Sequence, residues 1–464
     1  MKKDLLFFCL ITFSAGLFAQ TNQNISKPNI ILVMADDLGW GDVGFHGNKE
    51  ILTPQLDQMA ANSLHLKRFY AAAPVCSPTR GSILTGRHPE RYGIYFANVG
   101  FMKPQELTIA EILKTQGYTS GHFGKWHLGT LSKNLTDSSQ RTQRLNALYS
   151  PPWVNGFDIC FSSFSQMPTW NPMENQFVKQ NYYNEEEKIV SDNLEGDDSR
   201  IIMDRVIPFM QRSAGEKKPF FALVWFHAPH HPVIAGPEYK KMYPQLDEDK
   251  QHYYGAITAM DEQIGRLRKE LRRLGIEQNT ILFFTSDNGP ASPNEEGQGS
   301  FAKRLQGSAG LFRGRKTTLY EGGLRTPSLV EWPAIIKGKS ETDYMASTTD
   351  YYPTILDILN IKTELQPQPV DGISFLDVIK GKLKTRQRPI PFYSVKQQAL
   401  TDNRYKIYSS DEGKTFELYD LEKDPYEKQD IAKDHPEIVQ AMTKILRDWI
   451  TTCRRSETGA DYKF

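Results

Sequence analysis

Cysteine, net charge and long apolar stretches are all scarce in this chain of 464 residues. Four cysteines are too few for the disulfide framework of a small secreted domain. Lys and Arg number 56 against 55 Asp and Glu, so no overall charge favours nucleic acid or an anionic membrane as a partner. Beyond residue 19, no run is apolar enough to cross a bilayer. What is left has the composition of an ordinary globular protein with a large core.

The N-terminus has the pattern of a secretory signal peptide. Lys2 and Lys3 precede an apolar stretch from Leu5 to Phe18, and the polar segment begins at Gln20. The apolar stretch is too short for a membrane span. We therefore expect residues 1–19 to be removed and the protein to be exported, either to the periplasm or out of the cell.

Apolar strands alternate with amphipathic helices through the first part of the mature chain. Uninterrupted apolar runs predict buried strands, and apolar residues at helical spacing predict helices. The expected strands are 29–35, 118–123, 219–226 and 280–285, and the expected helices are 54–63, 106–116 and 254–274. Such alternation predicts an α/β fold with a large, mixed, mostly parallel sheet sandwiched by helices.

The C-terminal segment has a different pattern. Short apolar segments at 390–395, 405–409 and 416–419 predict a small antiparallel sheet, followed by a helix from Pro436 to about Cys453. We therefore expect a larger domain over 20–385 and an α+β subdomain over 386–464. Residues 131–172 lack periodicity and are expected to form a long loop near the mouth of a site.

Acidic and amide side chains follow two of the expected strands. Asp36 and Asp37 follow the first, and Asp287 and Asn288 follow the fourth. Either pair alone is typical of a plain turn. In parallel sheets, however, sites form at the carboxyl ends of the strands. Oxygen ligands without grouped histidine or cysteine favour calcium or magnesium over zinc.

Cys76 stands at the start of an expected helix, in the sequence Cys76-Ser77-Pro78-Thr79-Arg80. Pro78 suits a first helical turn, where exposed amides and the helix dipole favour an anion. A cysteine there could be a thiolate nucleophile, the site of an oxidative modification, or a buried structural residue. After signal removal the other cysteines are Cys160 and Cys453, and the sequence leaves open whether those two pair.

Several basic side chains are candidates for binding an anion. Lys125, His127, His230 and Lys316 occur in glycine- or proline-rich segments and are candidate anion ligands and proton donors. Basic residues near Lys316 could bind neighbouring carboxylates or sulfates of a polyanionic glycan, although a solvated charged surface explains them equally well; these are Lys303, Arg304, Arg313 and Arg315.

Taken together and in order, these segments resemble the type I sulfatases, the formylglycine-dependent branch of the alkaline phosphatase superfamily. The resemblance extends from Pro28 to about Ala432. Within the family, the chain resembles the arylsulfatases and the N-acetylgalactosamine-6-sulfatases. It rests on Met34–Asp42, Cys76–Arg80, Thr85–Arg87, Gly124–Gly129, Ala228–His230, Ser286–Gly289 and Glu417–Leu421.

The resemblance implies that Cys76 is oxidised to Cα-formylglycine by a formylglycine-generating or an anaerobic sulfatase-maturating enzyme. It also implies one Ca²⁺ ion bound by Asp36, Asp37, residue 76, Asp287 and Asn288. Arg80 would hold the hydrated aldehyde. Lys125, His127, His230 and Lys316 would surround the sulfate, which passes through a covalent formylglycine sulfate.

An exported sulfatase of this type is expected to act on sulfated carbohydrate, such as ulvan, carrageenan or a glycosaminoglycan. Arg313 and Arg315 are candidate contacts to that substrate. Two alternatives stay open: a phosphonate or phosphodiester hydrolase of the same superfamily, and a non-catalytic glycan-binding relative in which Cys76 is never converted. The sequence does not give the sugar, the sulfated position, exo or endo action, or the oligomeric state.

Overall fold

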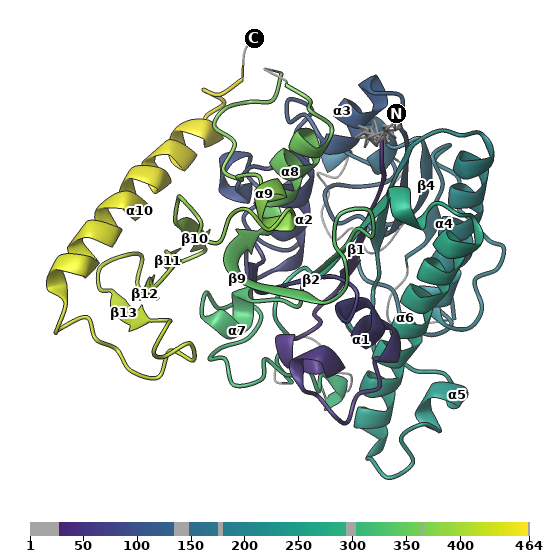
Figure 1. The fold of residues 1–464 in the computed structure, drawn as a ribbon, viewed down its shortest axis with the longest axis horizontal. Coiled ribbons are helices and arrows are strands. Elements are labelled where there is room, and N and C mark those ends of the chain that lie inside the picture. The colour runs from purple at the N-terminus through teal and green to yellow at the C-terminus, as the bar shows by residue number, and fades with distance from the viewer. Residues whose placement is uncertain (1–26, 134–147, 175–179, 294–302, 363–364, 463–464) are drawn as a thin grey trace, which may run out of the picture.

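A nine-stranded sheet runs through the larger part of the molecule (Figure 1). The computed structural model describes residues 27–133, 148–174, 180–293, 303–362 and 365–462, so the expected signal peptide lies outside the described residues. The strands are β1 (Asn29–Ala35), β2 (Leu64–Tyr70), β3 (Thr119–Lys125), β4 (Ile159–Ser163), β5 (Tyr182–Tyr183), β6 (Phe220–Trp225), β7 (Thr280–Ser286), β8 (Leu329–Glu331) and β9 (Ser340–Ser347).

The middle of this sheet is parallel. The strand order is β5-β4-β3-β6-β1-β7-β8-β2-β9. Neighbours from β4 to β7 pair in parallel, as do β2 and β9, whereas β5 and β8 pair antiparallel to their neighbours. The α/β class and the mixed, mostly parallel sheet are therefore confirmed. The central strand β1 is buried along its whole length, which explains its uninterrupted apolar sequence.

Helices cover both faces of the sheet, and the side chains of β1 show how. Ile31 and Val33 pack toward α1 (Pro54–Ala60), α4 (Asp198–Gly215) and α6 (Glu248–Arg273). Ile30 and Leu32 pack toward the opposite face. That face is covered by α2 (Cys76–Thr85), α3 (Ile109–Thr115), α8 (Tyr351–Ile358) and α9 (Leu376–Ile379) (Figure 1). Successive residues of a strand face opposite ways, so one apolar strand serves both layers.

Three single elements differ from the sequence-based expectation. The helix expected from 254 begins at Glu248, where Asp247 caps it by accepting a hydrogen bond from the Lys250 amide. Helix α4, with Pro208 inside it, was not expected at all. The expected loop 131–172 contains β4, which pairs with β3; part of that loop, 134–147, lies outside the described residues. Tertiary pairing makes β4 a strand despite its weak local pattern.

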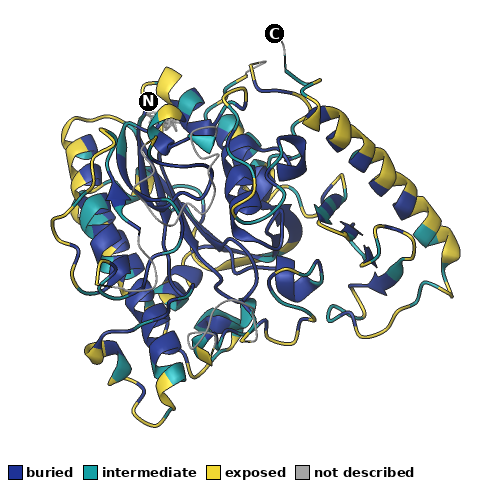
Figure 2. Cartoon of the chain, turned by 180° about the vertical axis from the view of Figure 1, so that it is seen from behind, coloured by how far each residue is buried: buried dark blue, intermediate teal, exposed yellow. Residues whose placement is uncertain are grey.

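The C-terminal part forms a second, four-stranded antiparallel sheet with one long helix, as expected. Its strands are β10 (Ile390–Ser394), β11 (Gln397–Thr401), β12 (Tyr405–Ser409) and β13 (Glu417–Asp420), and its helix is α10 (Pro436–Glu457). β11 was absent from the expectation. One face of α10, with Leu446, packs against Leu400 and Ile407 of the sheet. The other face of α10 is exposed (Figure 2).

The small sheet packs its second face against the larger part of the molecule. Phe392 and Tyr408 lie there against Leu319 and Leu324. Beneath that contact, the buried ammonium of Lys406 lies 3.0 Å from Glu321 and 2.8 Å from Glu427. Burial raises the pKa of Glu427 to about 7 despite this partner. The two parts are thus joined by apolar packing and by a buried ion network.

We expect Lys406→Met to lower the free energy of unfolding by about 3–5 kcal/mol, because it leaves the buried Glu427 without its cation and Glu321 with Arg325 alone. Urea denaturation measures the loss. Lys444→Met, at an exposed lysine that pairs with Asp448 on α10, is the control and should cost less than about 1 kcal/mol. Equal effects of the two substitutions would contradict the importance of the buried network.

Two further expectations concern the cysteines and the membrane. Cys160 and Cys453 are both buried free thiols, so the pairing that the sequence left open is not formed. Among the described residues, none of the helices combines the length and apolar character of a membrane span.

Candidate active site

The acidic residues after β1 and β7 lie side by side because the two strands are neighbours in register. Ala35 pairs with Ser286, the last residue of each strand. The Asp37 amide donates a hydrogen bond to Asp287 Oδ1 at 3.1 Å, and Asn288 Nδ2 donates to Asp37 Oδ1 at 2.6 Å. Asp37 has a left-handed backbone, with a φ of 65°, a conformation that non-glycine residues adopt mainly at functional turns.

Helix α2 brings Cys76 and Arg80 to these carboxylates. All ten residues of the helix are buried. Arg80 Nη2 lies 2.8 Å from Asp287 Oδ2 and 3.4 Å from Asp36 Oδ2, and Nη1 donates to the Lys125 carbonyl. The guanidinium also lies 5.1 Å from the ring centroid of Trp225. An arginine fixed by so many contacts is a rigid part of the site.

The Cys76 side chain faces the carboxylates and is only 1% exposed. Its Sγ lies 3.8 Å from Asp36 Oδ1. Burial raises the pKa of the Cys76 thiol to about 12, although Lys125 and Lys316 oppose the shift. An unmodified Cys76 is therefore a neutral thiol near pH 7, which argues against the thiolate nucleophile.

The donor set suits a hard divalent cation. Asp36, Asp37, Cys76 and His230 each present one ligand atom, and these atoms lie within 4.8 Å of one another. Asn288 Oδ1 is buried and has no hydrogen-bond partner among the described residues. Burial raises the pKa of Asp37, with Asp287 adding to the shift and Lys316 opposing it. A bound cation would satisfy the amide oxygen and stabilise the ionised carboxylates, and oxygen-rich sites favour Ca²⁺ or Mg²⁺.

Two lysines and a histidine complete the site around these carboxylates. Lys125 Nζ lies 2.6 Å from Asp36 Oδ2, and Lys316 Nζ lies 2.9 Å from Asp37 Oδ2. His230 Nδ1 donates to the His231 carbonyl at 2.8 Å. Its Nε2 therefore accepts from Lys316 Nζ at 3.3 Å. Burial lowers the pKa of His230 well below its usual value, which agrees with a neutral ring.

His127 is held by a residue that the sequence did not single out. Its Nε2 lies 2.8 Å from Asn98 Oδ1, which fixes the proton on Nε2 because the amide oxygen only accepts. Nδ1 is buried and has no hydrogen-bond partner in the described part of the chain. His127 has a φ of 59°. This arrangement leaves Nδ1 as a free proton acceptor.

The other basic candidates lie outside this group and bond to the protein itself. Arg313 stacks on the Tyr320 ring, 4.0 Å from its centroid, and donates to the Tyr419 hydroxyl at 2.7 Å. Arg315 donates to the Ala291 carbonyl at 2.9 Å. Arg304 donates to the Val233 carbonyl, and Lys303 is exposed. None of these contacts reaches the carboxylate group.

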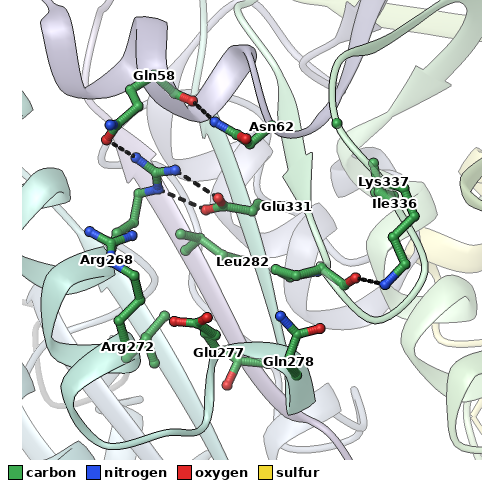
Figure 3. A pocket seen from close by; sticks show the side chains of 14 residues that line it. Gln58, Asn62, Arg268, Arg272, Glu277, Gln278, Leu282, Glu331, Ile336 and Lys337 are labelled. Atoms are coloured by element: carbon green, nitrogen blue, oxygen red, sulfur yellow. Dashed lines mark hydrogen bonds and ion pairs between the residues drawn. The ribbon is translucent and has the colours of Figure 1, made fainter.

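A separate cavity of about 620 Å³ lies at the opposite end of β7, near Thr280 (Figure 3). Its prominent arginine, Arg268, is already paired with Glu331 at 2.7 Å and bonded to Gln58. None of the candidate site residues lines it. The chemistry is therefore assigned to the carboxyl ends of β1 and β7.

Comparison with known proteins agrees with this geometry. The profile of the family described as Sulfatase matches residues 28–361, and that of the N-sulphoglucosamine sulphohydrolase C-terminal region matches 307–455. N-acetylgalactosamine-6-sulfatase of Canis lupus familiaris is 32% identical over 421 residues, which cover 86% of this chain and 74% of the relative. The chain belongs to the type I sulfatase family. It is a sulfuric ester hydrolase.

Further relatives are sulfatases as well. Arylsulfatase A of Bos taurus is 28% identical over 438 residues, which cover 88% of this chain and 79% of the relative. Among solved structures, Ps i-CgsB superposes with a TM-score of 0.79 at 25% identity, covering 91% of this chain and 93% of that one. The same protein in complex with k-i-k-neocarrahexaose superposes with a TM-score of 0.77 at 26% identity and the same coverages.

The residues that sequence reasoning missed have no local signal in this sulfatase. Asn98 reaches His127 from a loop 29 residues earlier in the chain. Trp225 is the last residue of an apolar strand, and the sequence pattern predicts an ordinary residue of the hydrophobic core there. Only the folded chain brings these side chains to the site, so neither spacing nor residue type could have identified them.

Proposed function

We propose that this sulfatase removes sulfate from sulfated carbohydrate outside the cytoplasm. The convergence of Asp36, Asp37, Cys76 and His230 beside Lys125 and Lys316 is the observation that carries the proposal. The class of substrate is supported by the names of the relatives, which include N-acetylgalactosamine-6-sulfatases, and by the carrageenan oligosaccharide in the complex of Ps i-CgsB. Export rests on the signal-peptide pattern of residues 1–19.

Asp36, Asp37, Asp287 and Asn288 would hold one Ca²⁺ ion together with an oxygen of residue 76. Such an ion withdraws charge from the sulfate and from the attacking oxygen. Lys125 lies beside Asp36 and Lys316 beside Asp37, and both ammonium groups would bind the non-bridging oxygens of the sulfate. Fixed charges of this kind act without reorganisation at the moment of reaction.

The reaction begins at residue 76, oxidised to formylglycine and hydrated to a geminal diol. One diol oxygen gives its proton to a carboxylate beside residue 76, such as Asp36, and attacks sulfur. The bond from sulfur to the sugar oxygen breaks with its electron pair on that oxygen. The proton for the leaving oxygen comes from Lys316, directly or through His230, whose Nε2 accepts from that ammonium. The result is a sulfate ester of residue 76.

The ester is released without a second attack by water. Nδ1 of His127, which has no partner among the described residues, takes the proton of the remaining hydroxyl at residue 76. The carbonyl re-forms as the bond from carbon to the sulfated oxygen breaks, and inorganic sulfate leaves. Asn98 holds the other nitrogen of the ring in the donating form, which orients Nδ1 for this step.

A panel of defined sulfated oligosaccharides tests the proposed substrate class. We expect sulfate release, measured by ion chromatography, from at least one carbohydrate sulfate, with kcat/KM at least about 100-fold above that for a simple aryl sulfate. The physical reason is that binding of the sugar contributes to transition-state stabilisation. Comparable rates on every ester, or release from aryl sulfate only, would contradict a carbohydrate-specific enzyme.

The same panel separates the alternative hydrolase. A phosphodiester and a phosphonate monoester with the leaving group of the aryl sulfate should react at least about tenfold more slowly if the site is built for sulfate monoesters. Faster turnover of either would assign the chain to that alternative. The non-catalytic alternative predicts an unmodified residue 76 and no release from any ester.

Conversion of Cys76 requires a partner, because replacing the thiol by an aldehyde oxygen is an oxidation that the site does not supply. We propose a formylglycine-generating or an anaerobic sulfatase-maturating enzyme. Co-expression with such an enzyme should raise the converted fraction of the peptide that contains residue 76, measured by mass spectrometry.

A further inference from the structure

The segment that carries Lys316 is held from outside by the C-terminal sheet. Lys316 lies between Gly314 and the short helix α7 (Glu321–Leu324), in a stretch without regular structure. Its own amide donates to the Pro290 carbonyl at 3.1 Å, next to the β7 strand end. On its other side, Leu319 packs in the cluster that joins the small sheet to the larger part of the molecule.

Thr317, the next residue, has a backbone conformation that is costly for its type. Its φ is 74°, in the left-handed region. A β-branched residue is a genuine outlier there, and such residues persist only where the surroundings fix them. The Thr317 amide donates to the Pro74 carbonyl at 2.8 Å, two residues before Cys76. The turn therefore needs support, and its shape sets the position of Lys316.

Within the turn, the Thr318 hydroxyl bonds the amide and the carbonyl of Arg315. From outside the turn, support comes from the side chain of Gln397, at the start of β11. Its Nε2 donates to the Thr317 carbonyl at 2.7 Å, and its Oε1 accepts from the Leu319 amide at 3.0 Å. The Tyr408 hydroxyl donates to the same Oε1 at 3.1 Å, which orients the amide. The amide thus bonds to the backbone on both sides of the bend. Ser394 pairs with Gln397 at the end of the β10–β11 hairpin, which places the side chain at the tip.

We propose that Gln397 is a positioning residue of the sulfatase reaction: it holds the Thr317–Leu319 turn and thereby fixes Lys316 against Asp37. This inference rests on the proposed role of Lys316. A lysine side chain is long and flexible, so the place of its ammonium depends on a fixed backbone. Lys316 Nζ meets both Asp37 Oδ2 and His230 Nε2, a geometry with little tolerance for a shift of the turn.

Gln397→Ala tests the proposal. We expect kcat to fall about 10- to 100-fold, because a displacement of about 1 Å in a positioning group costs up to about 100-fold. KM should rise less than kcat falls, because the contacts to the rest of the substrate are unchanged. The melting temperature should fall by less than about 3 °C, because Gln397 is partly exposed and its hydrogen bonds add little net stability.

Rescue by Thr317→Gly distinguishes positioning from general damage. Glycine adopts the left-handed conformation without strain, so the turn no longer depends on Gln397. We expect the double variant Gln397→Ala/Thr317→Gly to recover at least about tenfold in kcat over Gln397→Ala. The matched control is Gln398→Ala, the neighbour on the other face of β11, whose amide lies beside Gly413. It should leave kcat within about twofold.

A kcat of Gln397→Ala within twofold of the wild type would overturn the proposal. A loss of kcat that Gln398→Ala reproduces would also overturn it, as would a loss that Thr317→Gly does not relieve. Failure of the proposed function is separable, because affinity for inorganic sulfate, measured by calorimetry, also depends on Lys316. If the wild type releases no sulfate from any ester, Gln397→Ala must still weaken the binding of inorganic sulfate at least about fivefold. A wild type that binds no sulfate would contradict both the proposed function and the role of Gln397.

Discussion

Cys76→Ala abolishes sulfate release, by at least about 10⁴-fold, and leaves the melting temperature within about 2 °C of the wild type. The activity is lost because alanine cannot become the aldehyde whose hydrate attacks sulfur, and loss of a covalent nucleophile is among the largest single effects known in enzymes. The fold is kept because the hydrogen bond of the sulfur to Asp36, at 3.8 Å, is weak, and removal of a single sulfur atom vacates little space. Sulfate release and differential scanning calorimetry on the same preparations measure the two quantities.

Cys160→Ala is the matched control for this substitution. Cys160 is likewise a buried free thiol, but it lies in β4, away from the carboxylates. The Cys160→Ala variant should remain active. In the wild type, the peptide that contains Cys160 should keep the mass of its unmodified sequence. In the active wild type, the peptide with residue 76 should be lighter than its sequence mass by about 18 Da, since an aldehyde replaces the thiol there. Activity in a preparation with unmodified Cys76 would reject the mechanism.

Removal of the divalent ion should lower kcat at least about 100-fold, because the ion supplies several kcal/mol of charge stabilisation in the transition state. It should also lower the melting temperature, since a ligand that binds only the folded protein stabilises it. Dialysis against a chelator, elemental analysis and a sulfate-release assay test both effects. Adding Ca²⁺ back should restore the rate.

Asn288→Ala sharpens the metal experiment. It removes an amide oxygen that is buried and, in the part of the chain that the structure describes, unpartnered, so half-maximal activity should require at least about tenfold more Ca²⁺. Asn279→Ala, at the opposite end of β7, is the control and should titrate like the wild type. A protein freed of metal that keeps its full rate would refute the calcium assignment.

The layered fold could be predicted from sequence because local and tertiary preferences agree in its central strands. β1 and β7 are apolar throughout since both of their faces are buried, and their polar successors mark the strand ends. β4 and α4 could not be predicted in the same way. β4 is short, with three apolar residues followed by two serines, and becomes a strand by pairing with β3. α4 contains Pro208, a residue that normally ends a helix.

The candidate site divides along similar lines. Side chains that follow a buried strand or begin a helix can be identified from the sequence pattern, as Asp36, Asp287 and Cys76 were. Side chains that act by holding other side chains cannot be identified in this way. Asn98 and Gln397 are common amides in irregular or hairpin segments, and only the distances to His127 and to the Thr317 turn give them a role.

The ladder that pairs Ala35 with Ser286 has a consequence for how such an enzyme can be altered. The spacing of the acidic groups is set by backbone hydrogen bonds inside the sheet. Loops at the rim other than those that carry Asn98 and Lys316 can therefore be exchanged, shortened or lengthened to admit a different substrate, while the acidic groups stay where the two central strands place them.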